Sequence, residues 1–375
     1  MFKEYSEKNH TELSALTIIQ GGGTVKREDS DRNLMYDTSN LSNYKMVRKD
    51  DFIVHLRSFE GGLEKSSLDG IISPAYHTFH SDMADSRFYY PYFRSYEFIK
   101  HKLVSHVYGI RDGRSIDIDG MKTIEIPYTS IEEQRKIGDY LDCLDHLITL
   151  HQRKCEQTKN LKKYMLQKMF PQNGAKVPEI RFNGFTHDWE QRKFGDVVQV
   201  RRGLTYKPSD VQETGVRVLR SSNINEDTFV CGNDDVFVNP KTVNIDTVKQ
   251  NDILITSANG SSRLVGKHAL IKGIPDESAV HGGFMLLGIT KNYDFINASM
   301  NSSWYIRFIN IYVTGGNGAI GNLSKSDLDE QLILVPSDLE QKKIGEYFTN
   351  LDHLITLHQR QTDFYKKPNF YFISS

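Results

Sequence analysis

Residues 133–153 read EQRKIGDYLDCLDHLITLHQR, and residues 340–360 read EQKKIGEYFTNLDHLITLHQR. Sixteen of these 21 positions are identical, at a constant offset of 207 residues. Two of the five differences keep the charge, as in Asp139 against Glu346. Chance does not give an agreement of this length, so the chain is a tandem duplication of two large copies.

The repeated stretch predicts a helix in each copy. Apolar residues recur at steps of four and three, a spacing that keeps one seam of a helix facing a partner helix. We expect the first helix to run from about Ile131 to Phe170, ahead of Pro171. The second helix is expected to be the shorter arm, because the pattern stops at Arg360 and Pro368 follows. The seam residues are Ile137, Leu141, Leu144, Ile148, Ile344, Phe348, Leu351 and Ile355.

Composition indicates a folded protein of two or three domains. The chain has 375 residues, of which 38% are hydrophobic and 25% charged, and its net charge is −1. Any basic surface for a nucleic acid must therefore be local. The three cysteines show no metal-ligand spacing and are expected to be free thiols. The sequence shows neither a signal-peptide core nor an apolar run of membrane-spanning length, so a cytoplasmic protein without membrane contact is expected.

Outside the helices, two globular segments share a plan but little sequence. Residues 250–255 (QNDILI) mirror residues 49–54 (KDDFIV) at an offset of 201, each as a polar turn that leads into a strand. In the first segment we expect an aromatic-rich helix over 88–107 and a strand ending at Pro127. About 23 residues of the second segment, including the strand WEQRKFGD (189–196), have no counterpart in the first.

Motifs for nucleotide binding and catalysis are missing from the sequence. GSSRLVGKH (260–268) has one residue too many for a phosphate loop, and His268 stands where a hydroxyl should bind Mg²⁺, so a turn followed by a strand is predicted. The sequence contains no Asn/Asp-Pro-Pro-aromatic tetrad, nucleophile elbow or His-Glu-x-x-His motif. His151 and His358 fall on the seam and are expected to pair across a helix interface.

Basic, hydroxyl-rich and amide-rich loops remain as candidates for contact with DNA. Between residues 191 and 223, seven basic residues stand against three acidic ones. Arg can bind guanine edges and Asn adenine edges, whereas Lys and Ser hold phosphates. For any single residue an ordinary solvated surface explains the pattern better, but for the clusters together DNA contact is favoured. The predicted DNA-binding residues are Lys26, Arg27, Arg48, Lys49, Arg57, Arg111, Arg114, Arg201, Arg202, Lys207, Arg217, Arg220, Ser221, Asn223, Asn259, Ser261, Arg263 and Lys325.

The chain resembles the specificity subunits of type I restriction–modification systems. The resemblance rests on the doubled helix motif, on FTHDWEQRKFGDVV (185–198) and on PEIRF (178–182) before it. It implies an α+β fold with an internal pseudo-twofold repeat, in which long antiparallel coiled-coil helices separate two globular target recognition domains. The implied domains are 1–129 (recognition, lacking its opening strand), 130–172 (central spacer helix), 173–336 (recognition) and 337–375 (second spacer helix, shortened, with an atypical tail).

The resemblance also implies a mechanism. Each recognition domain would read one half of a bipartite site in double-stranded DNA, and the helices would fix the spacing between the halves. The seam helices would also bind two methylase (modification) subunits, which carry S-adenosylmethionine and flip the target adenine. Two restriction motor subunits, with ATP and Mg²⁺, would complete the complex. The chain itself is expected to be non-catalytic, with no metal site and no cofactor.

Three alternatives remain open. The short ends could mark a truncated or inactive allele of a specificity subunit. A self-contained nuclease or methylase would require a catalytic motif or activity from the purified chain alone. A coiled-coil adaptor would bind no DNA, with or without partners.

Overall fold

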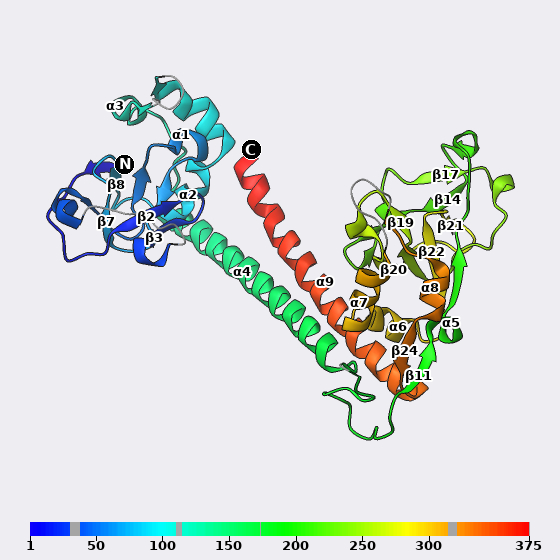
Figure 1. Cartoon of the computed structure of the whole chain (residues 1–375). Helices are drawn as coiled ribbons and strands as arrows, with labels where there is room; N and C mark the ends of the chain where they lie inside the picture. The colour runs from blue at the N-terminus through cyan, green and yellow to red at the C-terminus, as the bar shows by residue number, and fades with distance from the viewer. Residues whose placement is uncertain (31–37, 110–114, 173, 314–320, 375) are drawn as a thin grey trace. The chain divides into compact units, whose positions relative to one another are not determined.

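The structure, a computed structural model, describes residues 1–30, 38–109, 115–172, 174–313 and 321–374 (Figure 1). These residues fall into two compact units. Unit 1 consists of Met1–Arg153 with His358–Ser375, and unit 2 consists of Lys154–Leu357. Each of the two long helices thus contributes one part to each unit. The domain limits given above stay a prediction.

Module 1, which we define as residues 1–127, consists of short strands and helices. Their bounds are β1 Lys3–Tyr5, β2 Leu16–Ile19, β3 Gly23–Lys26, β4 Lys45–Val47, β5 Phe52–Val54, α1 Ser58–Gly61, β6 Glu64–Lys65, β7 Gly70–Ile72, β8 His77–His80, α2 Ser86–Phe93, a π-helical segment Glu97–Leu103, β9 Val107–Tyr108, β10 Ser115–Ile116 and α3 Ile118–Met121. The main sheet has the order β1-β8-β5-β6, with antiparallel neighbours throughout.

Module 2, residues 176–336, contains two four-stranded sheets, β12-β22-β18-β20 and β13-β17-β14-β21. Its elements are β11 Glu190–Lys193, α5 Phe194–Val197, β12 Gln199–Arg202, β13 Val211–Gln212, β14 Val216–Leu219, β15 Ile224–Asn225, β16 Thr228–Phe229, β17 Val236–Val238, β18 Ile253–Thr256, β19 Ala258–Asn259, β20 His268–Leu270, β21 Ala279–His281, β22 Met285–Ile289, α6 Tyr293–Met300, α7 Ser303–Tyr312, β23 Gly321–Asn322, α8 Lys325–Glu330 and β24 Leu332–Val335.

The two modules repeat one plan, as the sequence predicted. The sheet β1-β8-β5-β6 of module 1 corresponds to β12-β22-β18-β20 of module 2. In the turns that lead into β5 and β18, Asp51 and Asp252 each accept a hydrogen bond from the backbone N–H three residues upstream, at 3.2 and 2.8 Å. The preceding Asp50 and Asn251 have φ values of 71° and 68°, which short polar residues tolerate best.

Module 2 has a two-stranded closure for which the described part of module 1 shows no equivalent. β11 pairs antiparallel with β24, and the neighbouring Trp189 and Phe194 are buried in the core. At the offset of 207, residues 125–128 correspond to β24, but they form no strand. The predicted strand ending at Pro127 is therefore wrong, because a strand requires a partner and no described segment of module 1 occupies the place of β11.

A cavity marks the same difference in the core of module 1. Its volume is about 150 Å³, and its lining includes Phe52, Met121 and Ile126. The corresponding apolar residues of module 2 share one core cluster with Trp189 and Phe194. Module 1 thus keeps the apolar walls of this core, and its described residues leave a cavity beside them.

The aromatic-rich helix predicted over 88–107 is divided into two segments. α2 ends near Arg94, and the π-helical segment follows after Ser95. The Ser95 hydroxyl accepts a hydrogen bond from the backbone N–H of Phe98 at 3.1 Å and so starts a new helical segment. Module 2 shows the same division, since α6 and α7 are separate helices. The strand predicted after the polar turn of residues 49–51 is confirmed as β5, which ends at Val54.

The two long helices are α4 Ile131–Lys168 and α9 Asp338–Ser374. The first helix is confirmed, but the expected stop of the second helix soon after Arg360 is wrong, since α9 has 37 residues and is only one residue shorter than α4. A proline removes one backbone hydrogen bond and kinks a helix without always ending it. Packing also continues past the repeat, because the Tyr365 ring stacks on His151 at 5.7 Å.

The helices pack antiparallel within each unit. In unit 1, Nδ1 of His151 lies 3.1 Å from Nδ1 of His358, so the predicted histidine pair is confirmed. In unit 2, three contacts join rising residue numbers of one helix to falling numbers of the other: Cys155 to Ile355, Lys162 to Asp352 and Phe170 to Phe348.

The seam faces the helix interface. Leu144, Ile344, Phe348 and Leu351 are buried, and the other four predicted seam residues are half-buried. The three cysteines are free thiols, as expected. Within the ranges covered by the structure, no helix has both the length and the apolar character that a membrane span requires.

Candidate nucleic-acid interface

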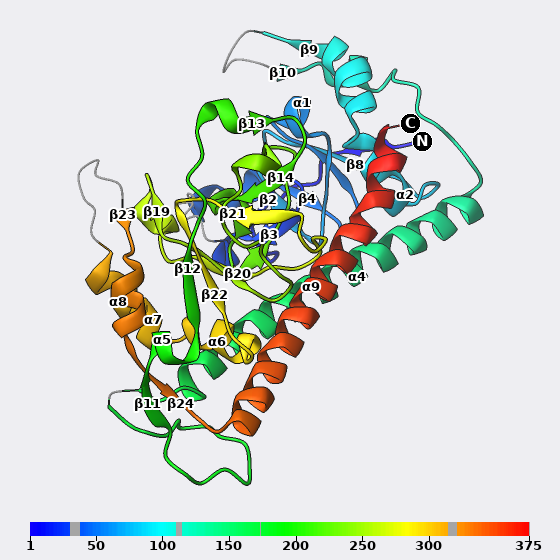
Figure 2. The same cartoon turned by 90° about the vertical axis from the view of Figure 1, so that its right-hand side faces the viewer.

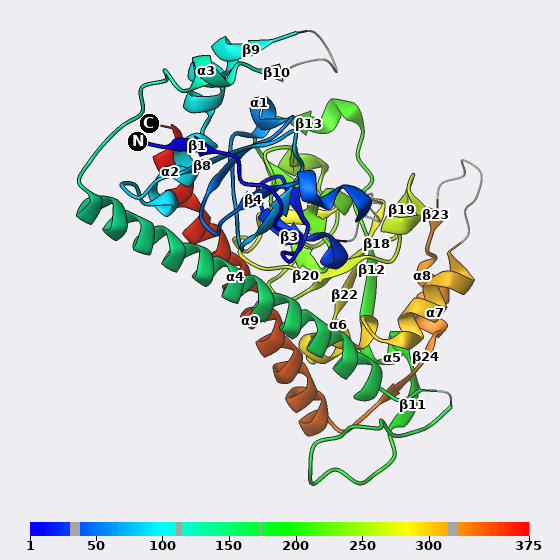
Figure 3. The same cartoon turned by 90° about the vertical axis from the view of Figure 1, so that its left-hand side faces the viewer.

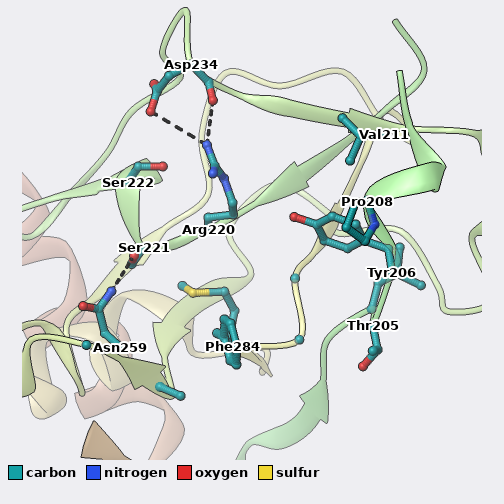
Figure 4. A pocket seen from close by; sticks show the side chains of 16 residues that line it. Thr205, Tyr206, Pro208, Val211, Arg220, Ser221, Ser222, Asp234, Asn259 and Phe284 are labelled. Atoms are coloured by element: carbon teal, nitrogen blue, oxygen red, sulfur yellow. Dashed lines mark hydrogen bonds and ion pairs between the residues drawn. The ribbon is translucent and has the colours of Figure 1, made fainter. Parts of the chain in front are cut away.

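A cleft of about 800 Å³ opens in module 2 where several strands end (Figure 4). β14 and β21 are parallel neighbours, so their carboxyl ends lie at the same edge of the sheet. Residues 220–222 follow β14, and residues 282–285 follow β21. A bridge between Leu204 and Gly282 brings the loop after β12 to this edge, and residues 258–260 complete the lining.

Two polar pairs lie in the cleft, and Figure 4 shows both. Nη2 of Arg220 donates a hydrogen bond to the backbone oxygen of Asp234 at 2.6 Å and lies 3.8 Å from its carboxylate. Nδ2 of Asn259 donates to the hydroxyl of Ser221 at 2.9 Å. The cleft therefore presents a guanidinium, an amide and hydroxyl groups, whose directions are fixed by neighbouring side chains.

Aromatic side chains complete the cleft, and the sequence analysis did not identify them. Phe284 is 69% exposed, and Tyr206 lies opposite it in Figure 4. A Cβ on Gly203 would lie 1.9 Å from the backbone oxygen of Gly282, so only glycine allows the two backbones to approach this closely. The run Gly282-Gly283-Phe284 was the available signal, since an aromatic residue after two glycines sits on a turn with little room to be buried.

Some of the predicted basic residues of module 2 are exposed, and others form ion pairs. Three cationic side chains that neighbour the cleft in sequence are exposed: Arg202, Lys207 and Arg263. Three others form ion pairs with aspartates of the same module: Arg201 with Asp246, Arg217 with Asp235, and Lys325 with Asp329. Ser261 is exposed beside Asn259. Of the residues predicted to bind DNA, the structure brings Arg220, Ser221 and Asn259 into the cleft.

Asn223 does not lie at the surface, which corrects its assignment as a DNA-contacting residue. Its side chain is buried and accepts a hydrogen bond from the backbone N–H of Arg220 at 2.8 Å. It also donates to Val230 and Asp235. Asn223 therefore stabilises the turn that presents Arg220. His281, at the end of β21, is also buried, and burial lowers its pKa to about 4, so it is neutral at pH 7.

In module 1 the predicted residues are scattered over separate turns. Arg48 is held by Glu7 at 2.8 Å, Lys26 lies 3.8 Å from Glu28, and Arg27 donates to a backbone oxygen at 3.3 Å. Lys49 and Arg57 are exposed. Arg111 and Arg114 lie outside the described residues.

Metal and nucleotide chemistry find no support in the described part of the chain. There, no group of three or more His, Cys, Asp or Glu side chains is arranged to hold a metal ion. Residues 260–268 form a 3-10 turn, Ser262–Leu264, that leads into β20, so the predicted turn followed by a strand is confirmed.

Comparison with known proteins finds a family match over the segment that holds the cleft. Residues 186–363 match the family described as "Type I restriction modification DNA specificity domain". The match agrees with the resemblance drawn from the sequence, and the lining of the cleft lies inside the matched residues.

Individual relatives agree with this assignment. The chain is 31% identical over 114 residues to the type I restriction enzyme MjaVIII specificity subunit of Methanocaldococcus jannaschii, a match that covers 29% of this chain and 26% of that protein. The chain thus spans about a quarter of the length of this curated relative.

Solved structures extend the similarity over the whole chain. The S subunit of a type I restriction–modification system from M. genitalium has a TM-score of 0.58 at 16% identity, covering 100% of this chain and 95% of that one. The HsdS subunit of Thermoanaerobacter tengcongensis has a TM-score of 0.47 at 14% identity, covering 99% and 95%. The first of these likenesses shows the fold: two modules and two long antiparallel helices, as predicted.

Proposed function

We propose that the chain is the DNA-specificity subunit of a type I restriction–modification complex. Each module reads one half of a bipartite site in double-stranded DNA, and α4 and α9 set the spacing of the halves. The helices also bind two methylase subunits, which carry S-adenosylmethionine. Two motor subunits with ATP and Mg²⁺ add the restriction activity. The chain itself supplies recognition and no catalysis.

The observation that carries this proposal is the cleft inside the specificity domain. Its guanidinium suits a guanine edge, its amide suits an adenine edge, and its exposed aromatic ring suits a thymine methyl group or an unstacked base. These groups come from three separate segments at the ends of strands, so they can be varied without altering the four-stranded sheets that support them.

The distribution of charge around the cleft supports separate residues for base contacts and for phosphate contacts. The lining carries one cation, Arg220, and one anion, Asp234, so the cleft itself adds no net charge. The exposed Arg202, Lys207 and Arg263 neighbour the lining segments in sequence and supply contacts with phosphates. Asp234 orients Arg220 before DNA arrives, which lowers the entropic cost of a directed contact.

Selection of bound sequences from a random duplex library tests the proposal. The full chain, purified with a type I methylase subunit, is expected to enrich a bipartite motif with a fixed gap. Arg220→Ala should weaken binding to the enriched motif by about 10–100-fold, the range for a lost bidentate base contact, and should relax one position. Phe284→Ala should relax a position in the same half.

Arg192→Ala is the matched control, because Arg192 is an exposed arginine on β11 and does not line the cleft. It should leave the motif unchanged. Enrichment of no motif by a folded complex would contradict DNA reading. A motif that survives both cleft variants unaltered would contradict the assignment of this cleft.

Exchange of a whole module tests the division into two readers. Replacing residues 185–330 with the corresponding residues of another specificity subunit should change one half of the motif only. A change in both halves would show that the modules do not read independently. Adding seven residues (two helical turns) after Leu144 should lengthen or abolish the gap, and an unaltered gap with full activity would contradict the spacer role.

A further inference from the structure

Each long helix begins against a short helix of the module that precedes it in the chain. α4 begins beside α2 (Figure 3), and α9 begins beside α6 (Figure 2). We call these contacts joint 1, formed by residues 85–87 and 134–142, and joint 2, formed by residues 292–294 and 341–349. Corresponding positions of the two joints are separated by the same offset of 207.

A buried glutamine makes equivalent contacts in both joints. Gln134 accepts a hydrogen bond from the backbone N–H of Asp85 at 3.0 Å and donates to the carbonyl five residues upstream at 2.8 Å. Gln341 accepts from the side chain of Asn292 at 2.7 Å and donates to the carbonyl five residues upstream at 2.9 Å. The repeated sequence thus includes a shared site for seating a module.

A glycine brings one module residue directly against the helix in each joint. A Cβ added to Gly138 would lie 3.1 Å from Cβ of Arg87. A Cβ added to Gly345 would lie 2.8 Å from Cβ of Asp294. Arg87 and Asp294 therefore occupy the same place in the two joints, although their charges are opposite.

The helix residues that face Arg87 and Asp294 also differ between the two joints, and each suits the module residue that it contacts. Nη1 of Arg87 donates hydrogen bonds to Asp139 at 2.6 Å and to Asp142 at 3.3 Å. The position of Asp142 is taken by Thr349 in the second copy, and the Thr349 hydroxyl donates to Asp294 at 2.9 Å. Each module residue thus faces a helix residue of complementary hydrogen-bonding character.

We propose that these pairs form a key that matches each module to its own copy of the helix. The module residue at 87 or 294 and the helix residue at 142 or 349 decide whether a module can be seated. The inference goes beyond DNA reading and concerns how the subunit is assembled, so it holds whatever sequence is bound.

The key makes an exchange of modules between the two positions asymmetric. Module 2 seated on α4 would place Asp294 against Asp139 and Asp142, and three carboxylates in one contact repel one another. Module 1 seated on α9 would place Arg87 near Glu346, which offers a carboxylate as Asp139 does. The second exchange is therefore tolerated, whereas the first requires changes on the helix.

Asp85→Asn/Arg87→Asp in the full chain reproduces the disfavoured pairing without moving a module. The first change is needed because Arg87 also pairs with Asp85 of its own module, whereas joint 2 has Asn292 at that position. We expect the melting temperature of unit 1 to fall by about 2–4 °C, the shift for a contact of this size in a unit of this length. Amide exchange should become faster in residues 86–93 and 131–142. Arg87→Ala, which removes the pair without adding repulsion, should cause a smaller fall.

Compensating substitutions distinguish a specific match between module and helix from a position that tolerates no substitution. The variant Asp85→Asn/Arg87→Asp/Asp142→Thr copies joint 2 and should recover most of the loss, because the new hydroxyl can donate to the new carboxylate. In joint 2, Thr349→Asp should destabilise unit 2, and adding Asp294→Arg should restore it. Lys193→Glu, in the exposed pair with Glu330, is the control and should shift melting by less than about 1 °C.

These outcomes leave no neutral result. A triple variant that melts as low as Asp85→Asn/Arg87→Asp, or that fails to fold as that double variant does, overturns the proposal. So does an Asp85→Asn/Arg87→Asp variant that melts like the wild type. All measurements are made without DNA, so a failure here is separate from a failure of DNA reading.

Discussion

Modules 1 and 2 share a sheet order and differ in how their cores are closed. In module 2, β11 pairs with β24, and Phe194 is fully buried beside them. In module 1, the segment equivalent to β24 forms no strand, and a cavity of about 150 Å³ lies in the core. One plan therefore tolerates two levels of packing, and the less filled module should be the less stable one.

The largest expected effect concerns this core. Phe194→Ala should destabilise unit 2 by about 3–5 kcal/mol, the usual cost of truncating a buried aromatic residue. Phe2→Ala beside the cavity of module 1 should cost only about 1–2 kcal/mol, because Phe2 is half-buried. Denaturant unfolding followed by amide exchange in each unit measures both values. Equal losses would show that the two cores are filled to the same extent.

The buried glutamines should give the next effect, and here the modules should agree. Gln134→Ala and Gln341→Ala each remove a buried amide that accepts one hydrogen bond from the module and donates another to the carbonyl five residues upstream, at a cost of about 1–3 kcal/mol. The same exchange experiment should locate each loss in its own unit. A clear difference between the two variants would contradict the equivalence of the joints.

Substitution of the joint glycines should again destabilise the two units unequally, by a smaller amount. In Gly345→Ala the new methyl group would meet backbone of residues 294 and 295, at 2.9 Å from the nitrogen of Phe295, and should cost about 1–2 kcal/mol. In Gly138→Ala the nearest atom would be Cβ of Arg87 at 3.1 Å, a looser contact, so the gain of about 1 kcal/mol in helix propensity should roughly cancel the cost. Calorimetry of the two variants decides between unequal and equal effects.

Acid should affect the joints least, and in joint 1 it should act through Asp85. Burial raises the pKa of Asp85, but hydrogen bonds and charge from Arg87 outweigh it and hold the pKa below its ordinary value. A lowered pKa gives stability that is present above about pH 4, the ordinary value, and lost as pH falls through the folded value. Asp85→Asn should flatten this part of the melting profile of unit 1 below pH 4. A profile that keeps its slope in the variant would assign the acid sensitivity elsewhere.

The sequence predicted what depends on repetition and periodicity. The duplicated 21 residues located both helices and the His151–His358 pair, whereas the antiparallel arrangement was implied by the family resemblance. The turns before β5 and β18 were visible because a short polar residue recurs before an apolar run. These features depend on interactions between residues close in sequence. Because the sequence is duplicated, the same pattern can be seen in both copies.

Features set by tertiary partners escaped prediction. Residues 123–127 have a strand-like composition, but a strand needs a neighbour, and composition does not show whether one is present. Asn223 and Ser221 look alike as loop residues, yet one is buried and the other lines the cleft. Phe284 was missed because an aromatic residue taken by itself is expected in a core, and the signal of the two glycines before it was not used.

Mapping of adenine methylation tests the central claim most directly. The full chain would be co-expressed with a type I methylase subunit in a host that lacks other adenine methylases, and methylated positions would be read across the genome. Two readers held by a helical spacer predict a single new methylated motif with two halves and a fixed gap. No new motif from a folded chain that binds the methylase, with a known specificity subunit active in the same host, would contradict the account.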